Sequence, residues 1–336
     1  GGGWGKPYRA IGTRRRGVGM AVAHQNGGAP GYPSSASVQL NHDGTAQVLA
    51  GSMELGTGCK TSFAQIGAEA LGLKVEDVYV VKDVDTETVP YACMTGASIS
   101  LFNEGLSVQI AAANARRQLL EMAFTAPWSP DSLKQGVNTA EDLDIKDSVI
   151  YVKADPSRCI AVKEVVGSVL APIVIGNAQR HGLSAIGPQP KASLAGFADV
   201  EVDVETGRIR VLKLILGHDS GRIINPQTAG NQVYGGALMS FGYALMEEVV
   251  FDPATGRVLN PALTDYRVPT SLDMPAMEII FSENIDPIGP FGAKGIGEAP
   301  MCYPHAAIAS AIYNAAGVRI SELPITPEKV LRALKG

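Results

Sequence analysis

The chain has 336 residues, of which 46% are hydrophobic and 18% charged, and its formal net charge is -5. This composition suits a folded protein with a sizeable core and excludes a disordered one. The absence of a long basic stripe argues against nucleic acid as a partner. No apolar run approaches the about 20 residues that a membrane-spanning helix needs.

The four cysteines are far apart in the sequence and form no C-x-x-C pair: Cys59, Cys93, Cys159 and Cys302. This spacing offers neither a zinc ribbon nor an iron–sulfur cluster of the chain's own. Isolated cysteines are typical of a reducing compartment, which favours the cytoplasm. The glycine-rich start, Gly1–Gly5, is interpreted as a terminal loop, because no strand precedes it and no G-x-G-x-x-G follows.

In the first half of the chain, alternating polarity predicts a hairpin with strands at 37–40 and 46–49 around Asp43-Gly44. Helical periodicity predicts helices over 61–71 and 98–124. Short β-rich runs predict further strands at 78–81, 150–152 and 160–162.

In the second half, scattered Gly and Pro between residues 168 and 195 predict an extended loop. Hairpins are expected at 198–216 and 248–259, and a strand at 277–281. Helices are expected over 232–247, 304–316 and 327–334, the last with Thr326 as its N-cap and Pro327 at its first position. Because helices and strands are interspersed with hairpins, we predict an α+β fold with mixed sheets and packed helices. We further expect two subdomains, 1–150 and 151–336.

Three loops each lead into a predicted helix, and they are rich in glycine or hydroxyl residues: 53–61, 93–100 and 219–236. Backbone N–H groups and hydroxyls at the start of a helix can bind an anion. The alternative interpretation is an ordinary turn or a Ser/Thr N-cap.

A fourth loop, 292–300, places Glu298 among glycines just ahead of an apolar segment. Few groups there could solvate its charge, and a poorly solvated carboxylate can serve as a general base. The alternatives are a solvent-facing acid or a carboxylate paired with Lys294.

Taken in order, these loops resemble the signature segments of the molybdenum hydroxylases, a family that includes xanthine dehydrogenases, aldehyde oxidoreductases and nicotinate dehydrogenases. The matching segments are Leu55-Gly56-Thr57-Gly58, Thr95-Gly96-Ala97-Ser98, Asn225-Pro226 with Gln232, Lys294–Pro300 and Leu323–Glu328. The resemblance covers the later half of the family's molybdopterin-binding subunit. Family members in which that subunit is split into two chains, such as the nicotinate dehydrogenases, are the most similar in organisation.

The resemblance implies that Glu298 is the catalytic base. It also implies that backbone and side-chain groups of this chain contact the cofactor: Gly56, Thr57, Thr95, Gly96, Ala97, Ser98, Ser100, Gln232, Lys294 and Gly295. Thr57 departs from the family's glutamine and offers one donor in place of two.

The function that the resemblance implies is that of an oxidoreductase. It would hydroxylate an electrophilic carbon of an aromatic N-heterocycle, purine-like or nicotinate-like, with oxygen derived from water. The implied cofactor is molybdopterin with molybdenum, in the cytosine dinucleotide form, and the pterin would hold the metal. A second molybdopterin-binding subunit would supply the earlier half of the family's sequence, and separate iron–sulfur and FAD subunits would carry the [2Fe-2S] clusters and FAD.

Three alternatives remain open at this point. The chain could be a non-catalytic subunit that holds cofactor in the same kind of complex, its substrate could be an aldehyde or an aromatic acyl thioester, or it could be an unrelated α+β enzyme with a phosphate site. For the substrate, the segment ahead of the first hairpin offers His24, Gln25 and Tyr32, which could also be ordinary loop residues.

Overall fold

The computed structural model describes residues 6–182 and 189–336, which form two compact units. The first unit comprises residues 1–25, 191–284 and 296–336, and the second comprises 26–190 and 285–295. Both units are therefore discontinuous in sequence, unlike the expected subdomains 1–150 and 151–336, and that division remains a prediction. The glycine-rich start at 1–5 lies outside the described residues.

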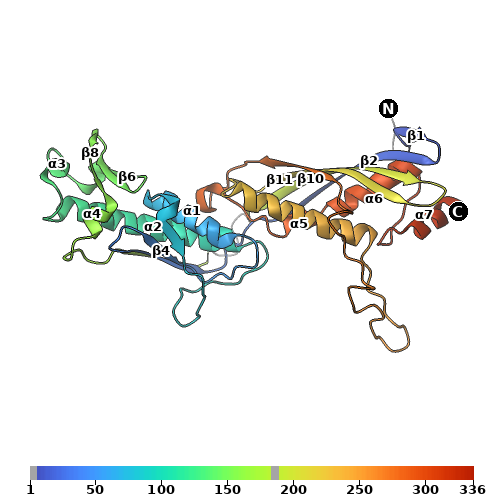
Figure 1. Cartoon of the computed structure of the whole chain (residues 1–336), viewed down its shortest axis with the longest axis horizontal. Coiled ribbons are helices and arrows are strands. Elements are labelled where there is room, and N and C mark those ends of the chain that lie inside the picture. The colour runs from blue at the N-terminus through green and yellow to red at the C-terminus, as the bar shows by residue number, and fades with distance from the viewer. Residues whose placement is uncertain (1–5, 183–188) are drawn as a thin grey trace. The chain divides into compact units, whose positions relative to one another are not determined.

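A five-stranded sheet organises the first unit, in the order β1-β2-β10-β11-β12 (Figure 1). Its strands are β1 (Arg9–Ile11), β2 (Arg14–Asn26), β10 (Lys191–Asp203), β11 (Ile209–Asp219) and β12 (Ala276–Ser282). β10 and β11 form an antiparallel hairpin, whereas β12 runs parallel to β11. The sheet is therefore mixed, as predicted. Its helices are α5 (Pro226–Leu245), α6 (Pro304–Ala316) and α7 (Pro327–Lys335), with a 3-10 turn, η4 (Ala299–Met301), before α6.

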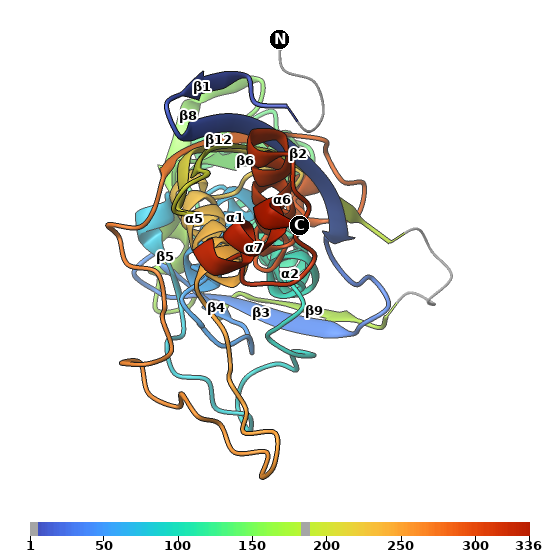
Figure 2. The ribbon, with the colours of Figure 1, turned by 90° about the vertical axis from the view of Figure 1, so that its right-hand side faces the viewer.

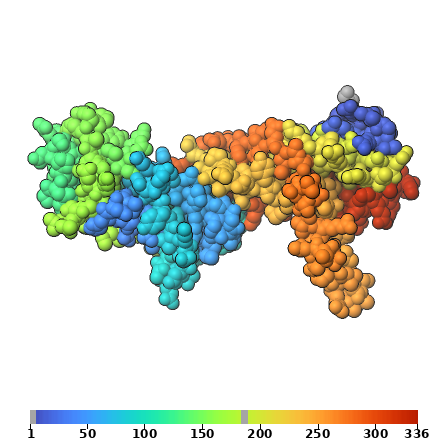
Figure 3. Space-filling view, viewed as in Figure 1, coloured from blue at the N-terminus to red at the C-terminus, as the bar shows by residue number. Residues whose placement is uncertain are grey.

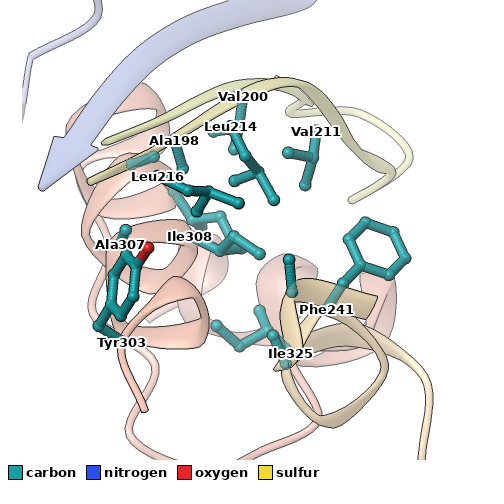
Figure 4. Packing of buried hydrophobic residues seen from close by; sticks show 14 of the residues in the cluster. Ala198, Val200, Val211, Leu214, Leu216, Phe241, Tyr303, Ala307, Ile308 and Ile325 are labelled. Atoms are coloured by element: carbon teal, nitrogen blue, oxygen red, sulfur yellow. The ribbon is translucent and has the colours of Figure 1, made fainter. Parts of the chain in front are cut away.

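The core of the first unit lies between the sheet and these helices. Buried and exposed residues alternate along β10, so one face of the strand is apolar and packs inward. Figure 4 shows Leu214 and Leu216 of β11 pointing toward Ile308 of α6, and all three side chains are fully buried. Burying each such side chain stabilises the fold by about 2 kcal/mol.

Two glycines bring β2 against α6. A side chain at Gly17 would collide with the backbone of Ala311 and Ala315, and one at Gly19 with the backbone of Ala307 and Ala311. The strand thus advances toward the start of the helix as it runs from residue 17 to residue 26. Figure 2 shows β2 lying across α6 in this way.

The second unit is built on a four-stranded sheet in the order β5-β4-β3-β9, with α1 and α2 packed against it. Its main elements are β3 (Ser34–Leu40), β4 (Ala46–Leu49), β5 (Val78–Val80), β9 (Ile175–Arg180), α1 (Cys59–Leu71) and α2 (Ser100–Thr125). A smaller antiparallel sheet joins β6 (Leu143–Lys146), β7 (Val149–Val152) and β8 (Asp155–Ala161). Short helical segments complete the unit: η1 (Val75–Asp77), α3 (Asp131–Lys134), η2 (Ala140–Asp142), α4 (Val162–Val166) and η3 (Pro290–Gly292).

Most predicted elements are confirmed, including the α+β class, the β3–β4 hairpin and Thr326 as the N-cap of α7. The extended loop predicted for 168–195 is wrong, because β9 and the start of β10 lie within it. The prediction failed because β9 owes its place to packing: a side chain at Gly176 would collide with the backbone of Ala111 and Ala115 in α2. The hairpin predicted at 248–259 is reduced to one isolated bridge between Phe251 and Val258.

In the part of the chain that the structure describes, no helix is both long enough and apolar enough to span a membrane.

Candidate active site

Glu298 stands at the N-cap of the 3-10 turn η4, directly ahead of the buried residues Ala299 and Pro300. Its own side chain is exposed in this chain. The expected poor solvation of its carboxylate is therefore absent here, because the apolar residues of the loop turn inward and the glutamate turns outward.

Gln25 contacts this carboxylate directly. The side-chain amide Nε2 of Gln25 donates a hydrogen bond of 2.9 Å to Oε2 of Glu298, across 273 residues of sequence. Gln25 is half-buried near the end of β2, and its Oε1 is buried with no hydrogen-bond partner in the described structure. The fold thus pairs the candidate base with a side chain that the sequence suggested only as a substrate contact.

Gln232 lies on the helix that packs against η4. A side chain at Gly236 of α5 would approach Pro300 Cβ to 2.5 Å and Met301 N to 2.9 Å, so helix and turn are in close contact there. Gln232 precedes Gly236 by four residues and so lies one turn earlier on the same helix face. Gln25 and Glu298 therefore meet at η4, and Gln232 lies one helical turn from the contact between α5 and η4.

Close to η4 in the chain, Tyr303 forms a buried, hydrogen-bonded pair with His218. Tyr303, the residue before α6, shares a 2.9 Å hydrogen bond between its hydroxyl and Nε2 of His218 on β11. Both side chains are 1% exposed. Burial lowers the pKa of His218 to about 4, so the imidazole is neutral near pH 7. Burial also raises the pKa of Tyr303, which therefore keeps its hydroxyl proton.

In the second unit, the loop at residues 51–58 is here called the Glu54 loop. The carboxylate of Glu54 lies at the start of α1. Glu54 accepts hydrogen bonds from the backbone N–H of Gly56 and Gly58, both at 2.9 Å, and from Lys60 N at 3.2 Å. The Thr57 hydroxyl lies 3.4 Å from the same carboxylate. Donors that the sequence suggested for an external anion are thus satisfied within the loop. The negative charge of Glu54 also suits the positive end of the helix.

Buried Glu104 and half-buried Thr95 hold the Glu54 loop in place. The carboxylate of Glu104, on α2, accepts hydrogen bonds from the backbone N–H of Gly51 and from both the backbone and the hydroxyl of Ser52. Thr95 Oγ1 accepts a 2.9 Å bond from Met53 N. This bond links the Glu54 loop to the loop at 93–98, here called the Ser98 loop.

The Ser98 loop carries two consecutive residues in the left-handed region, Ala97 (φ 50°) and Ser98 (φ 58°). Each such residue costs about 1–2 kcal/mol, and strain of this kind clusters at ligand-binding sites. Gly295 lies against this loop so closely that a side chain would meet Ser98 Cβ at 2.8 Å. The structure thus brings together the predicted residues Gly96, Ala97, Ser98 and Gly295. Lys294 beside them is buried, and Ser100 is the first residue of α2.

The remaining substrate candidates lie apart from Glu298 or in the other unit. His24 is exposed and, by strand alternation, points to the opposite face of β2 from Gln25. Tyr32 is exposed in the second unit, in a turn that Asn103 of α2 holds through its amide.

The sequence analysis missed Glu54 and Glu104 as ligands of the loop backbone. Glu54 carried a usable signal, since an acid a few residues ahead of a helix often accepts hydrogen bonds from its first N–H groups. Glu104 carried none, because only the tertiary fold places α2 beside Ser52.

Comparison with known proteins defines the class of protein. The family model described as a molybdopterin cofactor-binding domain matches residues 5–275. The chain belongs to this family, whose relatives include molybdenum-binding subunits of xanthine dehydrogenases and aldehyde oxidoreductases.

Three similar proteins illustrate the relationship. The xanthine dehydrogenase molybdenum-binding subunit of Escherichia coli O157:H7 is 33% identical over 331 residues, which cover 95% of this chain and 42% of that protein. The aldehyde oxidoreductase molybdenum-binding subunit PaoC of Escherichia coli K12 is 32% identical over 303 residues, covering 90% and 38%. The crystal structure of quinoline 2-oxidoreductase from Pseudomonas putida 86 matches with a TM-score of 0.82 and 27% identity, covering 96% and 42%. The chain spans about two fifths of the length of these relatives.

The donor set of the described residues fits a pterin cofactor. In the second unit, backbone groups of the strained Ser98 loop, the hydroxyls of Ser98 and Ser100 and buried Lys294 are groups of the kind that bind phosphate or pterin oxygens and nitrogens. In the first unit, the Gln232 amide is a group of the same kind. Gly295 packs so closely against Ser98 that position 295 has no room for a side chain. Among the described residues, no group of three or more His, Cys, Asp or Glu could hold a metal ion.

Proposed function

We propose that this chain is part of the molybdopterin-binding subunit of a molybdenum hydroxylase, an oxidoreductase, with Glu298 as its general base. The observation that carries the proposal is an exposed carboxylate at the N-cap of η4, bonded by the Gln25 amide, in a chain of this family. The bound cofactor would supply the redox chemistry. The carboxylate of Glu298 would accept the proton of the water-derived nucleophile that attacks the substrate carbon.

For cofactor binding we propose the residues that the sequence suggested. In the second unit these are Gly56, Thr57, Thr95, Gly96, Ala97, Ser98, Ser100, Lys294 and Gly295, and in the first unit Gln232. The support is strongest for the Ser98 loop, whose backbone is strained and closely packed against Gly295. It is weaker for Gly56 and Thr57, whose N–H and hydroxyl groups Glu54 already engages.

For the substrate we propose an aromatic N-heterocycle. Two of the proteins compared above are named for such compounds, xanthine and quinoline. The alternative is an aldehyde, after the second relative. His24 and Tyr32 stay candidates for substrate contact, and Gln25 is considered further below.

We also propose the assembly in which the chain works. The relatives are named as subunits, and this chain spans about two fifths of their length. A second polypeptide segment carrying the earlier part of the molybdopterin-binding subunit is therefore proposed, together with iron–sulfur and FAD subunits. The cytosine dinucleotide form of the cofactor and a cytoplasmic location complete the proposal. Four free, dispersed cysteines support a reducing compartment.

The decisive test is Glu298→Gln in the purified native complex. We expect molybdenum content to match that of the wild type, while kcat falls at least about a hundredfold, because the amide cannot accept the proton. Glu205→Gln, in the exposed turn between β10 and β11, is the matched control and should leave kcat unchanged. Wild-type turnover in Glu298→Gln would refute the proposal.

A non-catalytic, cofactor-holding subunit is the second candidate. The observation that favours it is Thr57, which stands where the family commonly has glutamine and offers one donor in place of two. Molybdenum retained together with full turnover in Glu298→Gln would support this alternative.

A further inference from the structure

We propose that Gln25 is a positioning residue for Glu298: its amide holds the carboxylate in place through a hydrogen bond. This inference rests on the proposed role of Glu298 as the base. It assigns Gln25 a role different from the substrate contact that the sequence suggested.

The fold explains why position 25 meets η4. Small residues occupy the inward positions of β2, Gly17, Gly19, Ala21 and Ala23, and they let the strand lie directly on α6. Gln25 is the next inward position after this stripe.

The path of β2 along α6 explains why Gln25 reaches Glu298. Between Gly17 and Gly19 the contacted backbone moves from Ala311 and Ala315 to Ala307 and Ala311. Two strand residues span about 7 Å and four helix residues span about 6 Å. Each pair of residues along β2 therefore advances by about one turn of α6. Six further strand residues therefore bring the chain past the start of α6, to η4, where Gln25 bonds Glu298.

The chemistry of the two groups fixes how the amide is oriented. A carboxylate only accepts hydrogen bonds, so the Nε2 side of the amide must face Glu298. This orientation leaves Gln25 Oε1 buried without a partner in the described structure. A buried acceptor without a hydrogen-bond partner lowers the stability of the fold, and the charge-assisted hydrogen bond to Glu298 offsets this loss.

The hydrogen bond should fix the geometry of the base. It restricts the side-chain rotamers of Glu298, and a hydrogen bond to a carboxylate is stronger than one between two neutral groups. The Cys302 thiol is a second titratable group in this turn. Burial, and next the charge of Glu298, raise the pKa of that thiol, so it is uncharged near pH 7.

The test measures the reactivity of the Glu298 carboxyl without relying on turnover. A water-soluble carbodiimide with glycine ethyl ester labels carboxyl groups, and peptide mass spectrometry gives the labelling rate at Glu298 in the purified holoprotein. In Gln25→Met, which keeps the side-chain length but removes the donor, we expect the rate at pH 6 to rise about threefold. In Gln25→Glu, nearly isosteric with Gln25, like-charge repulsion should raise it about tenfold.

Two controls accompany the series. Val22→Thr changes an exposed position on the outer face of β2 and should leave labelling of Glu298 unchanged. Exposed Glu283 provides an internal labelling reference in every digest.

Kinetics complete the test, with xanthine, quinoline and benzaldehyde as the probes. For any probe that the wild type turns over, Gln25→Met should lower kcat with KM unchanged. Wild-type labelling of Glu298 in both Gln25 variants would overturn the inference, as would a rise in KM alone. A wild-type complex that lacks molybdenum or turns over none of the probes would count against the proposed function instead, and labelling would still decide the role of Gln25.

Discussion

Two carboxylates, exposed Glu54 and buried Glu104, organise the Glu54 loop through hydrogen bonds to backbone N–H groups. Burial acts to raise the pKa of Glu54, but N–H donors from Gly58, Lys60 and Gly56 outweigh it and leave the pKa lowered. For Glu104 burial prevails, and its pKa is raised despite bonds from Ser52 and Gly51. The two acids therefore respond differently to pH, although both hold the Glu54 loop.

Buried His218 should make the stability of the first unit depend on pH. The unfolded chain binds a proton at this residue near pH 6.5, whereas the native imidazole does so only near pH 4. As pH falls from 6.5 to 4, the unfolded state gains protons that the native state does not, so stability decreases. The loss amounts to at most about 3 kcal/mol.

His218→Gln tests this expectation, because glutamine can still bond the Tyr303 hydroxyl but does not titrate. Urea denaturation at pH 7, 6, 5 and 4 should show a weaker loss of stability with acid than in the wild type. His42→Gln, an exposed histidine, should keep the wild-type pH dependence. Identical pH dependence in His218→Gln and the wild type would contradict the expectation.

At the scale of elements, the position of η4 depends on a close contact with α5. Pro300 and Met301 approach Gly236 so closely that no side chain fits between them. The adjacent Gly235, in the same helix, is exposed, and a Cβ added there would have no heavy atom of another element within 4 Å. Packing therefore requires glycine at position 236 but not at position 235.

This pair gives opposite expectations for the same substitution. Gly236→Ala should lower the free energy of unfolding by about 1–3 kcal/mol, because η4 must move away from the helix. The move should also displace Glu298 and lower kcat. Gly235→Ala should raise stability by about 0.5–1 kcal/mol, because alanine favours the helix. Thermal denaturation of both variants checks the signs, and a stabilised Gly236→Ala would refute the packing role.

At the scale of the whole molecule, a long segment of the first unit lacks regular structure. Residues 247–275 follow α5 and contain only the Phe251–Val258 bridge (Figure 3, orange). Large apolar side chains are exposed along it, including Leu263 at 81% and Leu272 at 96%. Exposed apolar surface of this kind typically marks an interaction site. The chain also spans only about two fifths of the length of its relatives.

We therefore expect this segment to become protected in the full assembly. Hydrogen–deuterium exchange at 247–275 should be at least about tenfold slower in the native complex than in the isolated chain. Peptides from β10, in the core, should be protected in both samples. Equal exchange of the segment in the two samples would show that it stays solvent-exposed.

Much of the local structure and the family followed from the sequence. Alternating polarity identified β3, β4, β10 and β11, and a Thr-Pro start identified α7, because these patterns reflect short-range preferences. The order of the loop motifs indicated the family, and the match over residues 5–275 confirms it. Glu298 came from the same motifs, and its role as the base remains a proposal.

Tertiary structure alone decided which groups meet. Glu298 was expected to be poorly solvated, yet it is exposed and bonded by Gln25. The backbone N–H groups of Gly56 and Gly58 were expected to bind an external anion, yet they donate hydrogen bonds to Glu54. Sequence patterns report the neighbours of a residue along the chain, and hydrogen-bond partners such as Gln25 and Glu298 are 273 residues apart. Only the packing of β2 on α6, through Gly17 and Gly19, brings that pair within reach.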